Sequence, residues 1–503
     1  MKRNRERVLG VLIALIALLR TAAVPDVQAA PTKPPNLVLV SIDGLRADRT
    51  GVYGASPSPT PGLDRLAAVG LVCDLALSQS NESLFSHAAL LTGRHPSEIA
   101  PPDYHSFVLP SSALLIPEIL KVYGYARAAF VAGGHVKGVY GFEQGFDPYW
   151  DDADFGSFFH TVPQAQAWLA EAPRAPFFMF LHGYDTHRPY LHAGLYNHVF
   201  DSDYQPSSTG NVDEVLIQSR IERVVDGSYY GDFPFQYFWH PGAAERILDP
   251  GGYARLREYA ATHVGKPITP RDAQHIRAHY DSGALSADIQ LSRFVETLHA
   301  SGAWDHTLMA VVADHGEDLG DHGLYNHRST LADSATRVPM ILTGGALPEA
   351  LRGHHIPGLC SAIDVLPTLL HAAGAVLPPD LPGRDLLSDA PAPPYIIQEG
   401  VLPMIAVRTP THRLTVQGLP LDSPLLELLV RVAPIAAPTF SLYDLEHDPA
   451  EQINVLQTQP DVARKLREYL LSWLASRKAQ GQGQAGPSLD PALRELLRQR
   501  GYW

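Results

Sequence analysis

Short apolar runs recur along the chain and alternate with amphipathic segments. Residues 36–42 read N-L-V-L-V-S-I, a pattern typical of a buried strand. Further strands are expected at 125–131, 176–181, 307–313, 338–342, 406–416 and 441–445, and helices at 61–68, 284–299 and 461–478. Because strands and helices alternate, the pattern predicts an α/β fold with a largely parallel central sheet and helices on both faces.

Composition and charge narrow the class of protein. The chain has 503 residues, of which 45% are hydrophobic and 18% charged, enough for one large core and a smaller appendage. Its formal net charge of −14 argues against a nucleic-acid partner, which would require a basic face. An anionic substrate would have to be attracted by a local charge such as a metal ion.

The ends and linkers divide the chain into predicted parts. Residues 1–29 combine a basic start, an apolar run over 8–19 and a V-Q-A cleavage pattern, which is typical of a signal peptide. Since that run is short for a membrane span, we expect cleavage and export to the periplasm or the medium, with an uncleaved anchor as the alternative. The remaining parts are a catalytic domain at 30–376 with an insertion at 192–270 near the substrate entrance, a C-terminal subdomain at 395–478 and a tail at 479–503.

The chain has two cysteines, Cys73 and Cys360, and both lie in apolar surroundings. An exported protein could join them in a disulfide, but their sequence context favours two buried free thiols.

The segment from Ser83 to Gly93 reads S-L-F-S-H-A-A-L-L-T-G and predicts a short helix. Ser83 opens this helix and Gly93 can end it. A helix N-terminus offers free N–H groups and a partial positive charge, which suits a tetrahedral anion such as sulfate or phosphate. The alternative is that Ser83 is an ordinary N-cap.

Potential metal ligands follow two of the predicted strands. Asp43 comes directly after 36–42, and Asp314 and His315 follow 307–313. The carboxyl ends of parallel strands meet at one edge of a sheet, where ligands bind. The second group belongs to A-D-H-G-E-D-L-G-D-H-G, a stretch that also holds Glu317, Asp318, Asp321 and His322.

Seven motifs occur in an order that identifies a family resemblance. They are V-S-I-D-G-L-R-A-D, A-A-L-L-T-G-R-H-P, F-E-Q-G-F-D, V-V-A-D-H-G-E-D-L-G-D-H-G, R-V-P-M-I-L, D-V-L-P-T-L-L and L-Y-D-L-E-H-D-P. Together they resemble the sulfatase family of the alkaline-phosphatase superfamily. The resemblance implies a three-layer α/β sandwich with a smaller C-terminal α+β subdomain. It also implies that the protein hydrolyses sulfate esters, with an anionic ester of a small molecule or a glycan as the substrate.

The resemblance further implies a divalent cation held by Asp43, Asp314 and His315, with the Ser83 oxygen completing its coordination. In the family this ion is commonly calcium. Gly44 stands where many members have a second aspartate, and a histidine ligand is present, so Mn²⁺ and Zn²⁺ remain alternatives.

Ser83 aligns with the family's Cys or Ser that is oxidised to formylglycine. The usual motif continues with Pro or Ala two residues on and Arg four residues on, whereas this chain has Phe85 and His87. The simpler interpretation is that Ser83 attacks unmodified, activated by the metal. His87 would then orient the nucleophile or bind the substrate anion.

Four more side chains are expected at the site by resemblance. His187 matches a histidine that contacts the ester and can protonate the leaving oxygen. Arg328 stands where many members have an anion-binding lysine, and His327 beside it matches a histidine of other branches. His135 is a weaker match to a substrate-binding position.

Two neighbouring residues are expected to support the site. His182 is interpreted as structural, and Arg46 is expected to brace the site or pair with a carboxylate.

Two other functions stay open. One is a phosphodiester or phosphonate ester hydrolase, or a phospho-group transferase, on the same fold. The other is a non-catalytic binding protein that kept the fold.

Overall fold

The structure is a computed structural model. It describes residues 33–99, 107–153, 155–173, 176–188, 190, 196, 198–204, 269–378, 380–417 and 440–479. The chain divides into a unit of residues 1–34 and a unit of residues 35–503, and the description below concerns the second. The predicted signal peptide, most of the predicted insertion and nearly all of the predicted tail lie outside the described residues.

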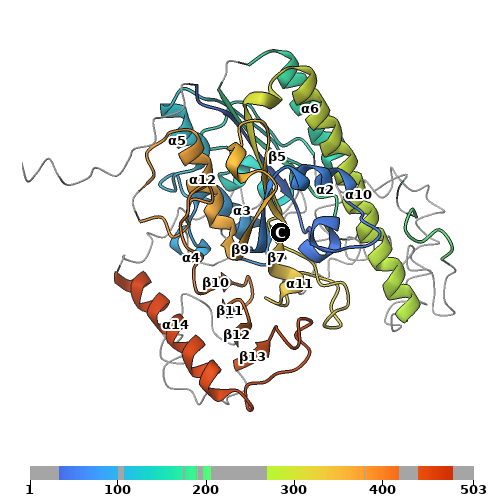
Figure 1. The fold of residues 1–503 in the computed structure, drawn as a ribbon, viewed down its shortest axis with the longest axis vertical. Coiled ribbons are helices and arrows are strands. Elements are labelled where there is room, and N and C mark those ends of the chain that lie inside the picture. The colour runs from blue at the N-terminus through green and yellow to red at the C-terminus, as the bar shows by residue number, and fades with distance from the viewer. Residues whose placement is uncertain are drawn as a thin grey trace, which may run out of the picture. The chain divides into compact units, whose positions relative to one another are not determined.

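A nine-stranded sheet forms the centre of the molecule (Figure 1). Its strands run in the order β4-β3-β5-β1-β6-β8-β2-β7, with β9 paired to β2. They are β1 (Asn36–Ile42), β2 (Leu71–Leu77), β3 (Ala126–Phe130), β4 (Tyr149–Trp150), β5 (Phe177–Gly183), β6 (Thr307–Val312), β7 (Arg337–Val338), β8 (Met340–Thr343) and β9 (His354–Ser361). The strands from β4 to β6 are parallel, as are β2 and β9, whereas β7 and β8 pair antiparallel to their neighbours.

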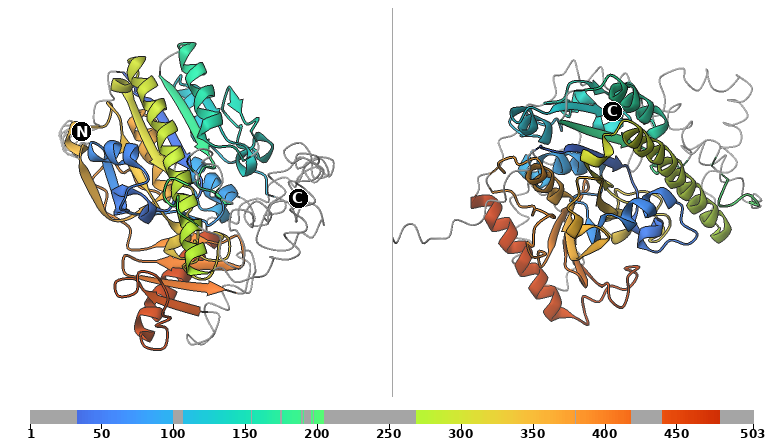
Figure 2. Two further views of the ribbon diagram at one scale, coloured as in Figure 1. Left: turned by 90° about the vertical axis from the view of Figure 1, so that its right-hand side faces the viewer. Right: turned by 45° about the horizontal axis from the view of Figure 1, so that its top comes forward.

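Helices cover both faces of this sheet, as the left view of Figure 2 shows. One face carries α2 (Pro61–Ala68), α6 (Phe158–Ala170) and the long α10 (Pro270–Ala300), which contacts both of the others. The other face carries α3 (Ser83–Thr92), α5 (Ile116–Val122) and α12 (Val365–Ala372). Two single-turn helices, α4 (Pro96–Ile99) and α11 (Asp333–Thr336), lie in the connections.

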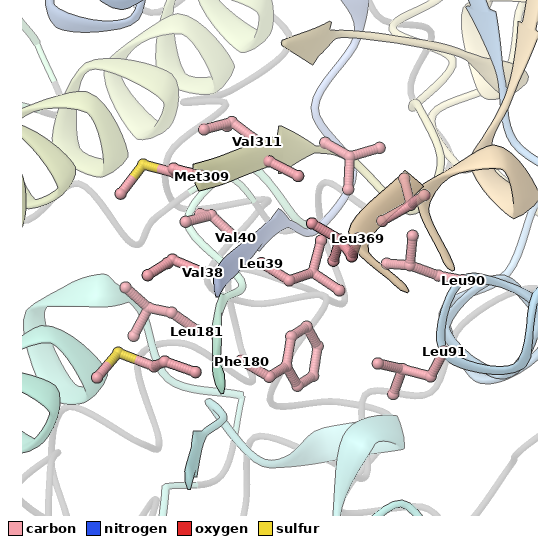
Figure 3. Close-up of a cluster of buried hydrophobic side chains, with 14 of the residues drawn as sticks. Val38, Leu39, Val40, Leu90, Leu91, Phe180, Leu181, Met309, Val311 and Leu369 are labelled. Carbon is pink, nitrogen blue, oxygen red and sulfur yellow. The ribbon is translucent and has the colours of Figure 1, made fainter. Parts of the chain in front are cut away.

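The core follows from the alternation of side chains along the buried strands. In Figure 3, Leu39 and Phe180 point toward Leu90 and Leu91 of α3, while Val38 lies on the opposite face of the sheet. Because both faces are covered, β1 is apolar at five of its seven positions and buried at all of them. This core fixes β1, β6 and α3, the elements that carry the predicted site.

A second, antiparallel sheet lies C-terminal to the first. It consists of β10 (Ile396–Glu399), β11 (Met404–Arg408), β12 (His412–Gln417) and β13 (Phe440–Asp444). Apolar side chains of α14 (Pro460–Ala479) pack on this sheet in a core of their own. The predicted α/β fold with a largely parallel central sheet and a smaller C-terminal α+β part is therefore confirmed, and the structure shows that the sheet of this smaller part is separate and antiparallel.

Two of the expected strands were wrong in detail. Residues 406–416 do not form one strand but belong to the hairpin of β11 and β12, because the chain reverses at 409–411. Residues 338–342 are divided between β7 and β8 at Pro339, whose missing N–H interrupts a ladder. The helix expected at 284–299 extends over 270–300, beginning at Thr269, which caps it.

Cys73 and Cys360 are buried free thiols, as expected. Among the described residues, no helix is both long enough and apolar enough to span a bilayer.

Candidate active site

The carboxyl ends of β1 and β6 bring Asp43, Asp314 and His315 together. The two strands are parallel neighbours, with Ser41 beside Val312, so the residues that follow them leave the sheet side by side. Asp314 Oδ1 accepts hydrogen bonds from the N–H groups of Gly44 (3.0 Å) and His315 (2.8 Å). Gly44 has a φ of 74°, a left-handed conformation that favours glycine over the aspartate common in the family.

The remaining carboxylate oxygens at this edge fit a cation. Asp43 Oδ1 and Asp314 Oδ2 are fully buried without a hydrogen-bond partner. One ligand atom each from Asp43, Asp314 and His315 lies within 4.8 Å of the others. Buried carboxylate oxygens without partners are costly unless they coordinate a metal, so the residues present fit the divalent ion that the family resemblance implies.

The charges and pKa shifts of Asp43 and Asp314 also favour a bound cation. Burial raises the pKa of Asp43, and the charge of Asp314 raises it further. Burial also raises the pKa of Asp314, but the imidazoles of His315 and His87 and the Gly44 N–H lower it overall. Two carboxylates held this close without a cation repel each other, which a bound divalent ion would relieve.

The ring of His315 is oriented for ligation. Its Nδ1 donates a hydrogen bond to the Gly316 carbonyl at 2.8 Å, which leaves Nε2 as the atom with a lone pair. Nε2 lies 3.4 Å from Asp314 Oδ2, 3.8 Å from Asp43 Oδ1 and 3.1 Å from Ser83 Oγ. The predicted nucleophile therefore lies beside all three predicted metal ligands.

Ser83 is the first residue of α3, as the sequence predicted, but it is not the N-cap. Glu82 takes that position, and its carboxylate accepts the Leu84 N–H at 2.9 Å. The Ser83 hydroxyl is thus released from capping and turns toward His315 and Asp43. Gly93 ends the helix with a φ of 67°.

His87 lies beneath the nucleophile, one turn along α3. Its Nδ1 donates to the Ser83 carbonyl at 2.7 Å, and its Nε2 accepts from the Ser41 hydroxyl at 2.9 Å. The ring is fully buried, and burial lowers its pKa. Both ring nitrogens are therefore engaged inside the protein, which favours the orienting role over direct contact with a substrate anion.

Glu82 and His135 form a buried pair next to Ser83, and sequence reasoning missed the carboxylate. His135 Nδ1 lies 2.8 Å from Glu82 Oε1. Burial raises the pKa of Glu82, but the charge and hydrogen bond of His135, with Arg328, lower it overall to about 2. The structure thus pairs the predicted substrate-binding His135 with an acidic N-cap. The signal was an acid directly before a predicted helix start.

His187, His327 and Arg328 line the same region. The His327 ring stacks on His315 with centroids 4.1 Å apart and lies 5.2 Å from the ring of His187. Arg328 is close enough that its charge lowers the pKa of His327, in addition to the larger effect of burial. His327 Nδ1 also lies 3.2 Å from a carboxylate oxygen of Glu317. The structure therefore brings these predicted residues to one place.

His187 is neutral in this setting. Its Nδ1 donates to the Arg188 carbonyl at 2.7 Å, and burial, with the neighbouring His327, lowers its pKa to about 3. Protonation of a leaving oxygen by His187 would require that a bound anion first raise this pKa.

The two supporting residues lie where they can act on the site. His182 Nε2 is 3.4 Å from Asp43 Oδ2. Arg46 pairs with Asp48 at 2.8 Å and Asp321 at 2.5 Å and also donates to the Glu317 carbonyl. The expected pairing of Arg46 with a carboxylate is confirmed.

Known proteins share this sequence pattern and fold. The sulfatase family profile matches residues 35–375. An N-acetylglucosamine-6-O-sulfatase of Bacteroides thetaiotaomicron is 23% identical, covering 75% of this chain and 74% of the relative. An ulvan-active sulfatase of Formosa agariphila is also 23% identical, covering 71% of this chain and 65% of the relative.

Solved structures agree on the fold. A protein solved in complex with its substrate D-glucosamine-2-N,6-O-disulfate superposes with a TM-score of 0.68 at 18% identity, covering 90% of this chain and all of the other. The phosphonate monoester hydrolase of Agrobacterium radiobacter superposes with a TM-score of 0.63 at 19% identity, covering 88% of this chain and 96% of the other. The resemblance inferred from the motifs is confirmed, and the chain belongs to the sulfatase family, within the alkaline-phosphatase-like superfamily.

Proposed function

We propose that this protein is an exported, metal-dependent hydrolase of sulfate esters with Ser83 as the nucleophile. One observation carries the proposal: Ser83 Oγ lies 3.1 Å from His315 Nε2, beside two buried carboxylate oxygens that lack partners. Relatives named for N-acetylglucosamine-6-O-sulfate and for ulvan support a sulfated glycan as the substrate. Export rests on the signal-like residues 1–29.

The chemistry begins at Ser83. Without a cation the hydroxyl donates to His315 Nε2; once that nitrogen holds the ion, the Asp43 carboxylate is the acceptor within reach for the Ser83 proton. Ser83 Oγ forms a bond to the ester sulfur while the bond from sulfur to the leaving oxygen breaks, and water later hydrolyses the serine sulfate. A cation held by Asp43, Asp314 and His315 would polarise the sulfate oxygens and lower the pKa of the serine hydroxyl.

Other side chains offset the charge that the reaction creates. Arg328 can bind the sulfate oxygens in a bidentate manner, and the N-terminus of α3, where Ser83 lies, adds a partial positive charge. His187 lies next to His327 on this side and can give a proton to the leaving oxygen once the bound anion has raised its pKa.

The local structure supports an unmodified serine. Phe85, which replaces the usual Pro or Ala, is buried with its ring 5.1 Å from that of Phe107. His87, which replaces the usual Arg, is fully engaged with Ser83 and Ser41. Mass spectrometry of the Ser83 peptide from the native host tests this. Formylglycine would lower the mass by about 2 Da, and that shift would contradict an unmodified nucleophile.

The decisive variant for the nucleophile is Ser83→Ala, assayed with an aryl sulfate. We expect turnover to fall to background while the circular dichroism spectrum stays unchanged. Ser86→Ala is a matched control, because Ser86 is buried in the same helix but donates only to the Ser80 carbonyl. Equal activity of Ser83→Ala and wild type would refute the nucleophile. No turnover in wild type with any ester would favour the non-catalytic alternative.

A phosphonate or phosphodiester hydrolase is the second candidate. It is favoured by the fold shared with a phosphonate monoester hydrolase and by 25% identity, over 44% of this chain, to a multifunctional alkaline phosphatase superfamily protein of Trinickia caryophylli. Parallel kcat/KM values for matched aryl sulfate and aryl phosphonate esters separate the two. A higher value for the phosphonate would replace the first proposal.

A further inference from the structure

A second group of metal-ligating side chains lies away from the candidate active site. His275 and His279 are four residues apart on α10, so they share one face of the helix, and His198 approaches them from a separate segment. One ring nitrogen of each histidine lies within 4.8 Å of the other two. The ring centroids are 4.7 Å apart for His275 and His279 and 5.3 Å apart for His198 and His279.

The His275 ring is held in a fixed orientation. Its Nδ1 lies 2.6 Å from Asp201 Oδ2, and the side chain is fully buried. The Tyr204 ring stacks on it with centroids 3.7 Å apart and planes inclined by 7°. Donation from Nδ1–H to a carboxylate leaves Nε2 with the lone pair, the arrangement found in carboxylate–histidine–metal sites.

Hydrogen bonds beside the three histidines join two stretches of chain that lie far apart in sequence. Asp201 accepts two hydrogen bonds from Arg271, at 2.6 and 2.7 Å. Tyr204 donates from its hydroxyl to Asp272 at 2.7 Å. Figure 1 and the right view of Figure 2 show the green segment that includes residues 198–204 beside the first turns of α10.

The type of ligand indicates the type of metal. Three imidazole nitrogens suit Zn²⁺, Cu²⁺ or Ni²⁺, whereas Ca²⁺ and Mg²⁺ prefer oxygen ligands. Ligand nitrogens around a tetrahedral zinc ion lie about 3.3 Å apart, given bonds of about 2.0–2.1 Å. The exposed His198 side chain can rotate toward its two partners, and small rotations of His275 and His279 on α10 close the remaining distance between these two rings.

We propose that His198, His275 and His279 bind one Zn²⁺ ion, with the fourth position open to solvent beside His198. The ion fastens residues 198–204 to the start of α10. This segment and the helix flank most of the predicted insertion at 192–270. The helix is in turn tied to the active site, because the hydroxyl of Tyr280, the neighbour of His279, donates to the Gly44 carbonyl at 2.6 Å. The zinc site therefore stabilises the base of the predicted substrate entrance.

Zinc binding can be measured separately from the active site. Asp314→Asn removes a carboxylate of the first site while preserving the cluster on α10, so we expect metal-free Asp314→Asn protein to bind one Zn²⁺ in calorimetric titration. Adding His279→Gln to that background should weaken binding by about 100-fold or more, since one of three ligands is lost. His299→Gln, an exposed histidine in the last turn of the same helix, is the matched control and should not change the affinity.

Two further measurements separate a loss of zinc binding from a loss of folding. His198→Gln changes an exposed side chain, so it should weaken Zn²⁺ binding without affecting the circular dichroism spectrum even if His279→Gln disturbs folding. Co²⁺ in place of Zn²⁺ should give visible absorption bands in Asp314→Asn that His198→Gln removes. Absence of Zn²⁺ binding to Asp314→Asn, or equal affinity with and without the histidines, would overturn the proposal.

Discussion

Two buried clusters of carboxylates in this protein differ in how their negative charge is balanced. At the interface with the C-terminal sheet, Asp333 pairs with Arg408 at 3.0 Å and with Arg413 at 2.6 Å, and Arg413 also pairs with Glu451. At the end of β1, Asp43 and Asp314 contact histidine rings, backbone amides and Ser83, and neither forms an ion pair with an arginine or lysine in the described part of the chain.

This difference shows where the positive charge that balances each cluster comes from. The arginines supply two positive charges for two carboxylates, and despite burial they lower the pKa of Asp333. In the other cluster, burial lowers the pKa of both His87 and His182, which disfavours their charged forms. Two carboxylates without protein cations match the charge of one divalent ion. The first cluster is balanced within the chain, whereas the second has ligands that fit the divalent ion proposed above.

The largest expected effect is on activity. Asp314→Asn keeps the acceptor for the Gly44 and His315 N–H groups but removes one charge from the metal site. We expect kcat/KM to fall by about 10³-fold or more, because metal stabilisation of transition-state charge amounts to several kcal/mol. The metal-free variant should unfold at a temperature no lower than metal-free wild type. A marked loss of stability would show that the carboxylate is structural.

Removing a charge from the cluster around Arg413 should instead lower the stability of the protein. Arg413→Met leaves Glu451 without its buried partner and weakens the contacts of Asp333. We expect a loss of about 3–5 kcal/mol in the free energy of unfolding, measured by urea denaturation. Arg464→Met removes an exposed pair with Asp461 and should cost less than about 1 kcal/mol. Similar costs for both variants would contradict a completed buried cluster.

Added metal should stabilise one cluster only. A divalent ion at 100 times its Kd should raise the stability of wild type by about 2.7 kcal/mol. Ca²⁺ is the informative probe, because the histidines on α10 offer it no oxygen ligands. Thermal unfolding of Asp43→Asn should not respond to Ca²⁺, whereas Arg413→Met should respond as wild type does, from a lower starting temperature. A Ca²⁺ response of Asp43→Asn would place the ion elsewhere.

A third buried carboxylate, that of Asp185, pairs with no arginine among the described residues, and it should hold a proton. Burial raises the pKa of Asp185 to about 7, although the Phe158 N–H lowers it in part. The folded state therefore binds a proton that the unfolded state releases, and this contribution to stability is lost as pH rises from about 4 to about 7. Asp185→Asn should flatten the decline of unfolding free energy across this range in urea titrations. An unchanged slope would show that Asp185 is ionised when folded.

The sequence was sufficient for elements whose signals are local. The apolar runs located β1, β5 and β6, and the residues directly after β1 and β6 located the predicted metal ligands. The hairpin of β11 and β12 was missed because the periodicity of two short strands continues across their turn. Strands β2 and β9 were not recognised as such, since β2 mixes buried positions with the exposed Asp74.

Contacts between distant residues were harder to predict. The pairing of Glu82 with His135 joins residues from two elements, and nothing in either segment indicates the other. The same is true of His198 with His275 and His279, since the helix that carries the last two was expected to begin only at residue 284. The orientation of His87 inward, toward Ser41, likewise depends on how α3 packs on the sheet.

The central claim is that the end of β1 and β6 binds a divalent ion beside Ser83. The most direct measurement is anomalous scattering from crystals of the protein grown with Mn²⁺. The account predicts a peak about 2.0–2.6 Å from Asp43 Oδ1, Asp314 Oδ2 and His315 Nε2, which is absent from crystals of Asp314→Asn. A map without a peak at these three atoms, in protein that hydrolyses its ester, would contradict it.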